Sequence, residues 1–381
     1  MSAKTKNFIV SEAEPSKSKV NMKSITPTIQ KSNTLFLVLI LLFVVSCRDK
    51  PTPPPDDKPK PGKRDYTWTI DTLAYPGSFQ TLMRDIYASS PTNVYVVGHN
   101  DQPGPGTMFR YDGKSWKTTR FHVADGGTVS GAVSLSAIHG FGPNDIYAVG
   151  ERIYENPTPP PNFLDSSLII HFDGISWKEI KIDKGNRLSC IWGGSSTSIL
   201  AGGSYGTLYY YNGTMWEKKN FDSSESIVNI GGLSNTEYYA STVVEYADSL
   251  CYGLIRLNGP NWQSVDSFTV VFSNIIWKFG YYLWQSPSGV LYSSGHGVYK
   301  RVGNSWEKIL NNDGPLFIYG SDDNNIYAVG AFGRIFHWNG TDWKRLFEIE
   351  LNIQFTSVWT NNIETFIAGN DGYKTFIIHG K

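Results

Sequence analysis

The sequence contains few of the residues with which enzymes and metalloproteins usually build their sites. Among its 381 residues are three cysteines and seven histidines, and these do not cluster at the spacing of metal ligands. There is no Gly-x-Ser-x-Gly, no His-Glu-x-x-His, no phosphate-binding loop and no EF-hand pattern. We therefore predict no metal ion and no cofactor, and the motifs indicate no catalytic residue.

The chain also lacks an excess of charge of either sign. Lysine and arginine total 34, aspartate and glutamate total 34, and charged residues make up 18% of the chain. Because nucleic-acid binding requires a basic surface and no basic stripe is present, we expect no nucleic-acid partner. Helical periodicity is missing after Cys47, whereas aromatic residues reach 14%, which is typical of packed β-sheet faces.

Only one long apolar run is present, and it is too short for a membrane span. Leu35–Val45 contains 11 residues, whereas about 20 are needed to cross a bilayer. The run matches the hydrophobic region of a signal peptide, which we place at residues 1–46, with Met22 as an alternative start. Val44–Cys47 resembles the lipobox of bacterial lipoproteins, in which Cys47 would become the lipidated first residue. An ordinary signal peptide followed by an incidental cysteine is the alternative.

The segment after this run is predicted to be a spacer. Arg48–Asp65 reads RDKPTPPPDDKPKPGKRD, and its prolines favour an extended chain that joins no core. Residues 47–65 are thus expected to link a lipid anchor to a folded domain at 66–381. The combination resembles surface lipoproteins of Gram-negative bacteria. This resemblance implies a lipid anchor in the cell outer membrane or at the cell surface, and Arg48 directly after the cysteine agrees with outer-membrane sorting.

A repeated element dominates the rest of the chain. A Gly-x-x-Trp motif occurs six times, at Gly113/Trp116, Gly174/Trp177, Gly213/Trp216, Gly259/Trp262, Gly303/Trp306 and Gly340/Trp343. Successive tryptophans are 61, 39, 46, 44 and 37 residues apart. A unit of about 40 residues that varies by insertion is the sequence signature of a repeat array or β-propeller.

Each unit contains four short strand-like runs, named a to d from first to last. In unit 2 strand a is Leu135–His139, strand b is Ile146–Gly150, strand c is Leu168–Phe172, and strand d begins at Trp177. A residue in strand a is followed eight positions later by one in strand b in six units: Tyr87/Tyr95, His139/Tyr147, Trp192/Leu200, Gly231/Tyr239, Trp284/Tyr292 and Tyr319/Tyr327. A one-residue slip would turn every side chain to the other face, so this constant spacing predicts a packed hairpin.

A seventh unit starts at Phe355 and lacks its own strand d. Its a–b spacing, from Trp359 to Phe366, is seven instead of eight. Tyr66–Thr72, ahead of unit 1, contains Trp68 and is expected to supply the missing strand, which would close the ring without a free sheet edge. The predicted fold is all-β, a seven-bladed β-propeller of four-stranded blades, closed by an N-terminal strand that completes the last blade.

Insertions are expected on one face of this ring. The a–b and c–d turns are short and form what we call the short-turn face, whereas the b–c and d–a connections form the long-loop face. Long connections are predicted between strands b and c of units 1, 2 and 4 (His99–Gly106, Glu151–Ser167 and Thr242–Tyr252) and after Trp116 and Trp262. Variable loops on one side of a rigid scaffold favour a binding role.

The unit 2 insertion carries the candidate ligand-binding residues, which are Arg152, Tyr154, Glu155, Phe163 and Asp165. Its prolines stiffen the backbone, and a stiff loop loses less entropy on binding. A solvated insertion without a partner is the alternative.

Aromatic and histidine side chains share one register near the end of strand a: Tyr87, His139, Trp192, Trp284, Tyr319 and Trp359. They would form either a sugar-stacking ring or packing between blades, and packing is the more frequent role of such a column. The tryptophans of the Gly-x-x-Trp motifs are also expected to be structural. Cys190 and Cys251 fall in different units, which favours two free thiols over a disulfide.

The Asp-Gly-x-x-Trp and Asn-Gly-x-x-Trp turns resemble the Asp-box of secreted bacterial propellers, whose Asp-x-Gly-x-x-Trp is one residue longer. The resemblance covers residues 66–381. It implies a fold and carries no activity, because glycan-processing enzymes such as sialidases use the motif structurally.

Two functions from different classes follow. The first is a non-enzymatic binding or scaffolding propeller, monomeric and lipid-anchored, that recognises a glycan or an envelope protein through its long-loop face. The second is a carbohydrate-active hydrolase or lyase whose axial active site gathers carboxylates from several blades. A purely structural role in an envelope complex is a third interpretation.

Overall fold

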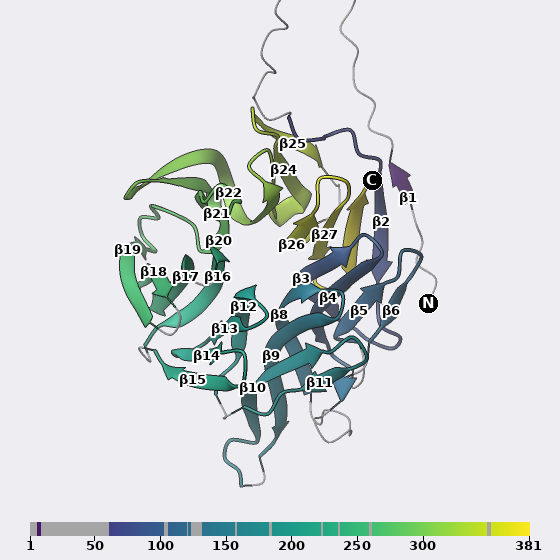
Figure 1. Ribbon diagram of the computed structural model, residues 1–381, viewed down its shortest axis with the longest axis vertical. Coiled ribbons are helices and arrows are strands. Elements are labelled where there is room, and N and C mark those ends of the chain that lie inside the picture. The colour runs from purple at the N-terminus through teal and green to yellow at the C-terminus, as the bar shows by residue number, and fades with distance from the viewer. Residues whose placement is uncertain are drawn as a thin grey trace, which may run out of the picture. The chain divides into compact units, whose positions relative to one another are not determined.

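Runs rich in Val, Ile, Tyr and Phe form strands, and Gly, Asn, Asp and Ser form the turns between them. The computed structural model describes residues 6–8, 61–102, 106–119, 121–122, 132–156, 158–182, 185–221, 224–234, 237–258, 261–348 and 352–381. The apolar run and Cys47 lie outside these residues. The strands form seven blades of four antiparallel strands in a ring, so the chain is a β-propeller as predicted (Figure 1).

Blades 1 to 4 follow the chain in order, with strand a nearest the axis. Blade 1 consists of β3 (Thr81–Ser90), β4 (Asn93–Asn100), β5 (Met108–Tyr111) and β6 (Trp116–Thr118). Blade 2 consists of β8 (Ala132–Gly142), β9 (Asp145–Glu155), β10 (Phe163–Phe172) and β11 (Trp177–Glu179), with β7 (Phe121–His122) parallel to β11. Blade 3 consists of β12 (Leu188–Ser195), β13 (Ser198–Gly203), β14 (Thr207–Tyr211) and β15 (Trp216–Asn220). Blade 4 consists of β16 (Ser226–Ser234), β17 (Glu237–Glu245), β18 (Ser249–Asn258) and β19 (Asn261–Val271).

Blades 5 and 6 form one continuous sheet of six strands, because β22 runs from the end of blade 5 into the start of blade 6. The strands are β20 (Tyr282–Gln285), β21 (Leu291–Val302), β22 (Ser305–Asp322), β23 (Asn325–Gly330), β24 (Arg334–Trp338) and β25 (Trp343–Glu348), with a 3₁₀ turn, η1 (Ala331–Gly333), before β24. The b and c segments of unit 5 are both part of β21. Its register with β22 shifts near Gly297, whose φ of 110° requires glycine.

The eight-residue spacing seen in the sequence is confirmed as cross-strand pairing. All six predicted pairs are opposite one another in the a–b hairpins. In blade 7, formed by β26 (Gln354–Thr360), β27 (Thr365–Asn370), β28 (Thr375–Gly380) and β2 (Trp68–Leu73), the pair Trp359 and Phe366 is also in register. Its spacing is shorter because this hairpin lacks the bulge that precedes the a–b turn in blades 1 to 4 and 6.

Three connections predicted to be long are mostly strand, and in unit 2 strands β9 and β10 leave only residues 156–162 between them. In unit 4, β17 extends to Glu245 and β18 begins at Ser249, so the b–c connection contains only residues 246–248. After Trp262, β19 continues to Val271 before the d–a connection starts. The sequence prediction was wrong here because polar residues interrupt the apolar alternation of strands that extend past the neighbouring blades.

The c–d turns of blades 1, 2, 3 and 6 share one geometry. Oδ1 of Asp112 accepts hydrogen bonds from the backbone N–H groups of Lys114 (3.0 Å) and Ser115 (2.9 Å), and Asp173, Asn212 and Asn339 make the same pair of contacts. The glycine that follows takes a φ near 90°, a region that disfavours other residues. These Asp and Asn side chains therefore shape the turns in which they lie.

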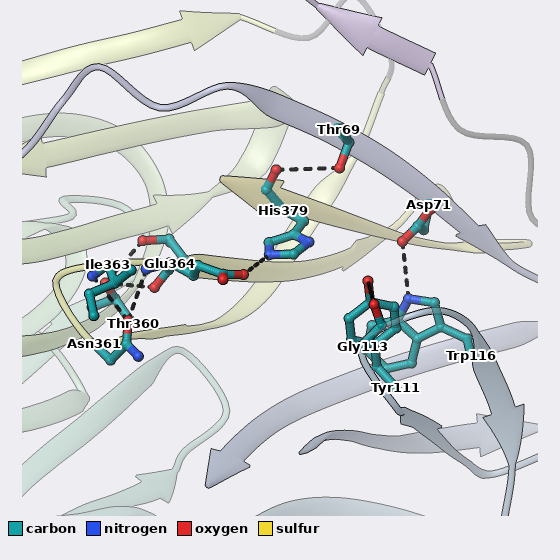
Figure 2. A network of polar contacts seen from close by, with 11 residues as sticks. Thr69, Asp71, Tyr111, Gly113, Trp116, Thr360, Asn361, Ile363, Glu364 and His379 are labelled. Atoms are coloured by element: carbon teal, nitrogen blue, oxygen red, sulfur yellow. Dashed lines mark hydrogen bonds and ion pairs between the residues drawn. The ribbon is translucent and has the colours of Figure 1, made fainter. Parts of the chain in front are cut away.

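Pairing of β2 with β28 closes the ring, as the sequence predicted. The register runs from Trp68 opposite Gly380 to Leu73 opposite Thr375. Figure 2 shows a link between blades, in which Nε1 of Trp116 donates to Oδ2 of Asp71 at 3.1 Å, and a contact within blade 7, in which His379 lies 2.5 Å from Glu364. The first of these ties the outer strand of blade 1 to the strand that completes blade 7.

A short strand, β1 (Lys6–Phe8), adds a fifth strand to this sheet by pairing antiparallel with β2. The sequence analysis did not predict it, because residues 6–8 lie in the segment expected to be a signal peptide, and a mature chain that begins at Cys47 would lack this strand. Elsewhere, among the residues that the structure describes, no helix is long and apolar enough to cross a membrane.

Prediction for ring closure. Trp68 is only 4% exposed, so Trp68→Ala should lower the free energy of unfolding by about 3–5 kcal/mol, as large core truncations do. Trp262 occupies the same motif position in blade 4 but is 39% exposed, so Trp262→Ala should cost about 1 kcal/mol or less. Urea denaturation followed by circular dichroism compares the two. Equal losses of unfolding free energy in the two variants would contradict the role of Trp68 in closing the ring.

Candidate binding surface

A cavity of about 420 Å³ lies at the axis and is lined mainly by strand a of the blades. Five of these strands contain a bulge at the same register, at Arg84, Ser136, Ser189, Val228 and Thr356. Each of these five residues lines the cavity. In each of these five blades the bulge therefore turns one extra residue toward the axis. The alternation of apolar and polar residues in the sequence does not reveal this position.

The aromatic column also surrounds this cavity. Its members contact neighbouring blades: His139 lies 6.2 Å from Trp192 between ring centroids, and Trp284 lies 6.5 Å from Tyr319. The Tyr87 hydroxyl donates to the Gly142 carbonyl oxygen in blade 2 at 3.4 Å. The predicted packing between blades is confirmed by these contacts, and the same side chains form the wall of the cavity.

Asp85 is the carboxylate in the wall of this cavity, and its oxygens are already engaged. It accepts hydrogen bonds from the backbone N–H groups of Ile86 (2.8 Å) and Ile138 (2.9 Å) and from the Ser357 hydroxyl (2.7 Å). Burial raises its pKa to about 6, against the effect of these hydrogen bonds. Because it joins blades 7, 1 and 2, its arrangement indicates a structural role.

A charged cluster lies toward the long-loop end of strand a, and the sequence analysis missed it. Arg84 donates to the Ser134 hydroxyl (2.7 Å), and burial followed by the nearby charge of Arg187 lowers its pKa. Nη1 of Arg187 lies 3.9 Å from Oε1 of Glu151. The three charged residues come from three different blades, so no local motif could have indicated that they meet.

The predicted unit 2 residues lie on one extended hairpin. β9 and β10 continue beyond the rest of blade 2 (Figure 1), and only residues 156–162 connect them. Arg152 forms an ion pair with Glu179 of the same blade. The backbone register places Asp165 opposite Ile153, Tyr154 opposite Leu164, and Phe163 opposite Glu155.

Exposed aromatic side chains gather on the long-loop face. Of the large exposed aromatic residues, six belong to b–c or d–a connections: Phe79, Tyr205, Tyr246, Phe272, Phe332 and Tyr373. At the a–b and c–d turns one exposed aromatic residue, Trp262, starts strand d of blade 4, and the other exposed large residues there are not aromatic: Ile175, Met215, Leu233, Val302 and Ile363. The two faces therefore differ in the kind of surface they offer.

Two of these aromatic residues are held in a strained backbone conformation. Tyr205 (φ 50°) and Phe332 (φ 59°) occupy equivalent b–c turns in blades 3 and 6, and each precedes a glycine. The N–H of that glycine donates to a carbonyl of the following d–a connection, Glu225 at 2.6 Å or Ile353 at 2.8 Å. A left-handed conformation costs a non-glycine residue roughly 1–2 kcal/mol, so the turns hold these side chains outward at a cost in stability.

Cys190 and Cys251 are free thiols, and burial raises the pKa of Cys190 to about 12. Within the described residues, no group of three His, Cys, Asp or Glu side chains is arranged to hold a metal ion.

No protein-family model matches the chain, and no curated protein matches its sequence. Solved structures match its fold. YCF48 bound to a D1 peptide is 16% identical, with a TM-score of 0.56 over 84% of this chain and 99% of that one. The WD40 β-propeller domain of Doa1 is 10% identical, with a TM-score of 0.55 over 80% of this chain and 97% of that one.

A third match is the extracellular domain of the two-component system BT4673 from B. thetaiotaomicron. It is 11% identical with a TM-score of 0.53, and the match covers 81% of this chain but 39% of that one. Identities this low show the propeller fold alone.

Prediction for acid sensitivity. Burial lowers the pKa of His139 to about 4, whereas an unfolded histidine titrates near 6.5. Protons therefore bind the unfolded chain more readily, and stability should fall as the pH drops from about 6.5 to 4, by on the order of 3 kcal/mol for this residue. Urea midpoints measured across that range should fall more steeply for the native chain than for His139→Gln. If the urea midpoints of the two proteins fall equally with pH, the acid sensitivity does not come from His139.

Proposed function

We propose that this chain is a non-catalytic binding propeller of the bacterial cell envelope, anchored by lipid at Cys47, and that its long-loop face binds a protein partner. The observation that carries the proposal is the concentration of exposed aromatic side chains on that face, where six of the seven exposed aromatic residues lie. Aromatic residues combine large contact area with a low entropy cost and are enriched at interfaces. Strained turns that hold Tyr205 and Phe332 outward support the same conclusion, because strain concentrates at functional sites.

A protein is favoured over a glycan as the partner. Two of the structural matches are a propeller bound to a peptide and a WD40 propeller domain. The charged cluster of Arg84, Glu151 and Arg187 at the inner rim of the long-loop face adds paired charges of both signs, which suit a polypeptide with mixed side chains. The extended β9–β10 hairpin, with Glu155 and Asp165 exposed, would form one border of this surface.

The hydrolase alternative draws little support from the axial cavity. Retaining and inverting glycosidases require two carboxyl groups roughly 5–10 Å apart. The cavity wall contains Asp85, whose oxygens accept three hydrogen bonds from protein groups. Nε2 of His139 is engaged with the Gly193 carbonyl oxygen at 3.0 Å.

The chain enters the propeller from the side opposite the proposed binding surface. The N–H of Gly62 donates to the Asn339 carbonyl oxygen (2.9 Å), and Arg64 contacts Asp342 (2.9 Å), so this segment is held on a c–d turn of blade 6. A side chain at position 62 would come within 2.1 Å of the Asn324 carbonyl oxygen, which requires glycine there.

Prediction for the anchor. Cys47→Ala should prevent lipidation and move the protein from the membrane fraction to the soluble fraction, since each buried CH₂ of an acyl chain contributes about 0.8 kcal/mol to membrane binding. Labelled palmitate should enter the native chain in a bacterial host and not the variant. If the native chain incorporates no palmitate, the anchor proposal is wrong.

Prediction for the binding face. A photo-crosslinking amino acid placed at Tyr205 or Phe332 should yield covalent adducts with one envelope protein in intact cells. The same group at Ile175 or Ile363, which are equally exposed but lie on the short-turn face, should yield none. Adducts from both faces would contradict the proposal. Binding to glycans on an array without any protein adduct would establish the glycan alternative.

A further inference from the structure

Aromatic side chains from three successive blades line the axial cavity toward the short-turn face. Trp284, Tyr319 and Trp359 belong to strand a of blades 5, 6 and 7 and occupy the same register. All three line the cavity, whose volume is about 420 Å³. Small-molecule sites are cavities of about 300–1,000 Å³ that are lined mainly by apolar and aromatic side chains. The cavity has the size of such a site, and this end of it has the lining.

Several polar atoms in this part of the wall have no partner in the protein. Gln285, the last residue of β20, is only 8% exposed, and its Oε1 accepts no hydrogen bond from the described part of the chain. The Tyr319 hydroxyl also lacks a partner within the described ranges, as do the indole N–H groups of Trp284 and Trp359. Leaving a buried polar group without a partner costs free energy. A ligand that both donates and accepts hydrogen bonds would therefore be favoured here.

The short-turn end of the cavity carries no charge at neutral pH. Among the residues that line the cavity, the charged ones are Arg84 and Asp85, which precede Tyr87 on β3 and so lie nearer the long-loop end. His139 has the aromatic register in blade 2, and burial lowers its pKa to about 4, so it is neutral. A charged ligand would lose its hydration without gaining an opposite charge, which favours a neutral ligand.

Blade 4 leaves a gap in this ring of side chains. Gly231 occupies the register at which the other blades carry an aromatic side chain or His139. A Cβ atom at position 231 would lie 2.9 Å from the Leu283 carbonyl oxygen, so a larger residue does not fit without a shift of the backbone. Gly231 and Gly232 both line the cavity. Blade 4 thus contributes backbone, in place of a ring, to the wall beside Trp284.

We propose that the short-turn end of the axial cavity binds a neutral sugar. The sugar ring packs against Trp284 and Trp359, because the C–H groups of a pyranose form an apolar face that suits an aromatic ring. Its hydroxyl groups bond to Oε1 of Gln285 and to the Tyr319 hydroxyl. A hydroxyl group donates one hydrogen bond and accepts two, so the same ligand also serves the indole N–H donors. The cavity is lined by a single carboxylate, Asp85, which is consistent with binding without hydrolysis.

This site is separate from the long-loop face that we propose for a protein partner. The aromatic register lies next to the a–b turns, so a sugar would enter from the short-turn face. Photo-crosslinking at Tyr205 or Phe332 reports on the protein partner alone, and sugar binding reports on the axis alone. The two proposals can therefore fail independently.

Isothermal titration calorimetry tests the site on the full chain carrying Cys47→Ala. The ligands are free glucose, galactose, mannose, N-acetylglucosamine, maltose and cellobiose. At least one should bind with a dissociation constant of about 1 mM or tighter. Glucuronic and galacturonic acid should bind more weakly than glucose and galactose, because no positive group lines this end of the cavity. If none of the neutral sugars binds, or if a uronic acid binds more tightly than all of them, the proposal is wrong.

Tyr319→Phe separates binding from folding in the same background. The variant should keep the urea midpoint of the native protein, since the hydroxyl it removes has no partner within the described residues. It should weaken sugar affinity about threefold to tenfold, the loss expected for one hydrogen bond. Gln285→Leu should weaken affinity in the same direction.

Tyr87→Phe is the matched control. Tyr87 has the same register in blade 1, but its hydroxyl already donates to the Gly142 carbonyl oxygen at 3.4 Å. This variant should change sugar affinity by less than about twofold. Sugar affinity that is unchanged in both Tyr319→Phe and Gln285→Leu would place the sugar elsewhere and overturn the proposal, as would an equal loss in Tyr319→Phe and Tyr87→Phe.

Discussion

Backbone pairing at strand edges is the constraint on which this structure depends. Each blade alone is a small sheet with two edges and two apolar faces, and a ring removes the exposed faces by packing every blade between two others. The ring holds only if its ends are joined, and the pairing of β2 with β28 joins them. Trp68 adds burial to this contact, and Asp71 adds a hydrogen bond to Trp116 of the adjoining blade. The first and last parts of the folded domain are thereby held in one sheet.

The need to pair or protect strand edges also explains which residues occur on the outer strands. In five blades a lysine after the motif tryptophan keeps the outer strand charged. In blade 4 the outer strand has no lysine or arginine, and a β-bulge at Val265 interrupts it instead. These outer strands are thus protected by charge or by a bulge.

Residues of strand a at the axis both contact the neighbouring blade and line the cavity. Repeated bulges in strand a turn one residue per blade toward the cavity, and these residues bond to the next blade as well, as Ser189 does to the Ile227 carbonyl oxygen at 2.6 Å. Asp85 is the clearest case, since a buried carboxylate is tolerated there only because three donors surround it. Chemistry at the axis would disturb contacts between blades, whereas the turns of the long-loop face are free to vary.

The sequence by itself determined the repeat, the blade count, the a–b register and the strand that closes the ring. These are visible because they depend on local periodicity, on turn residues such as Asp112 and Gly113, and on a motif that recurs at nearly constant spacing. Only the tertiary structure decided where the strands end and the connections begin. β19 and the unit 4 hairpin continue as strands because they pair with neighbouring strands. It also decided that Arg84, Glu151 and Arg187 meet, and that Arg152 of the predicted loop is paired with Glu179. Contacts between residues of different blades depend on closure of the whole ring, which no local stretch of sequence encodes.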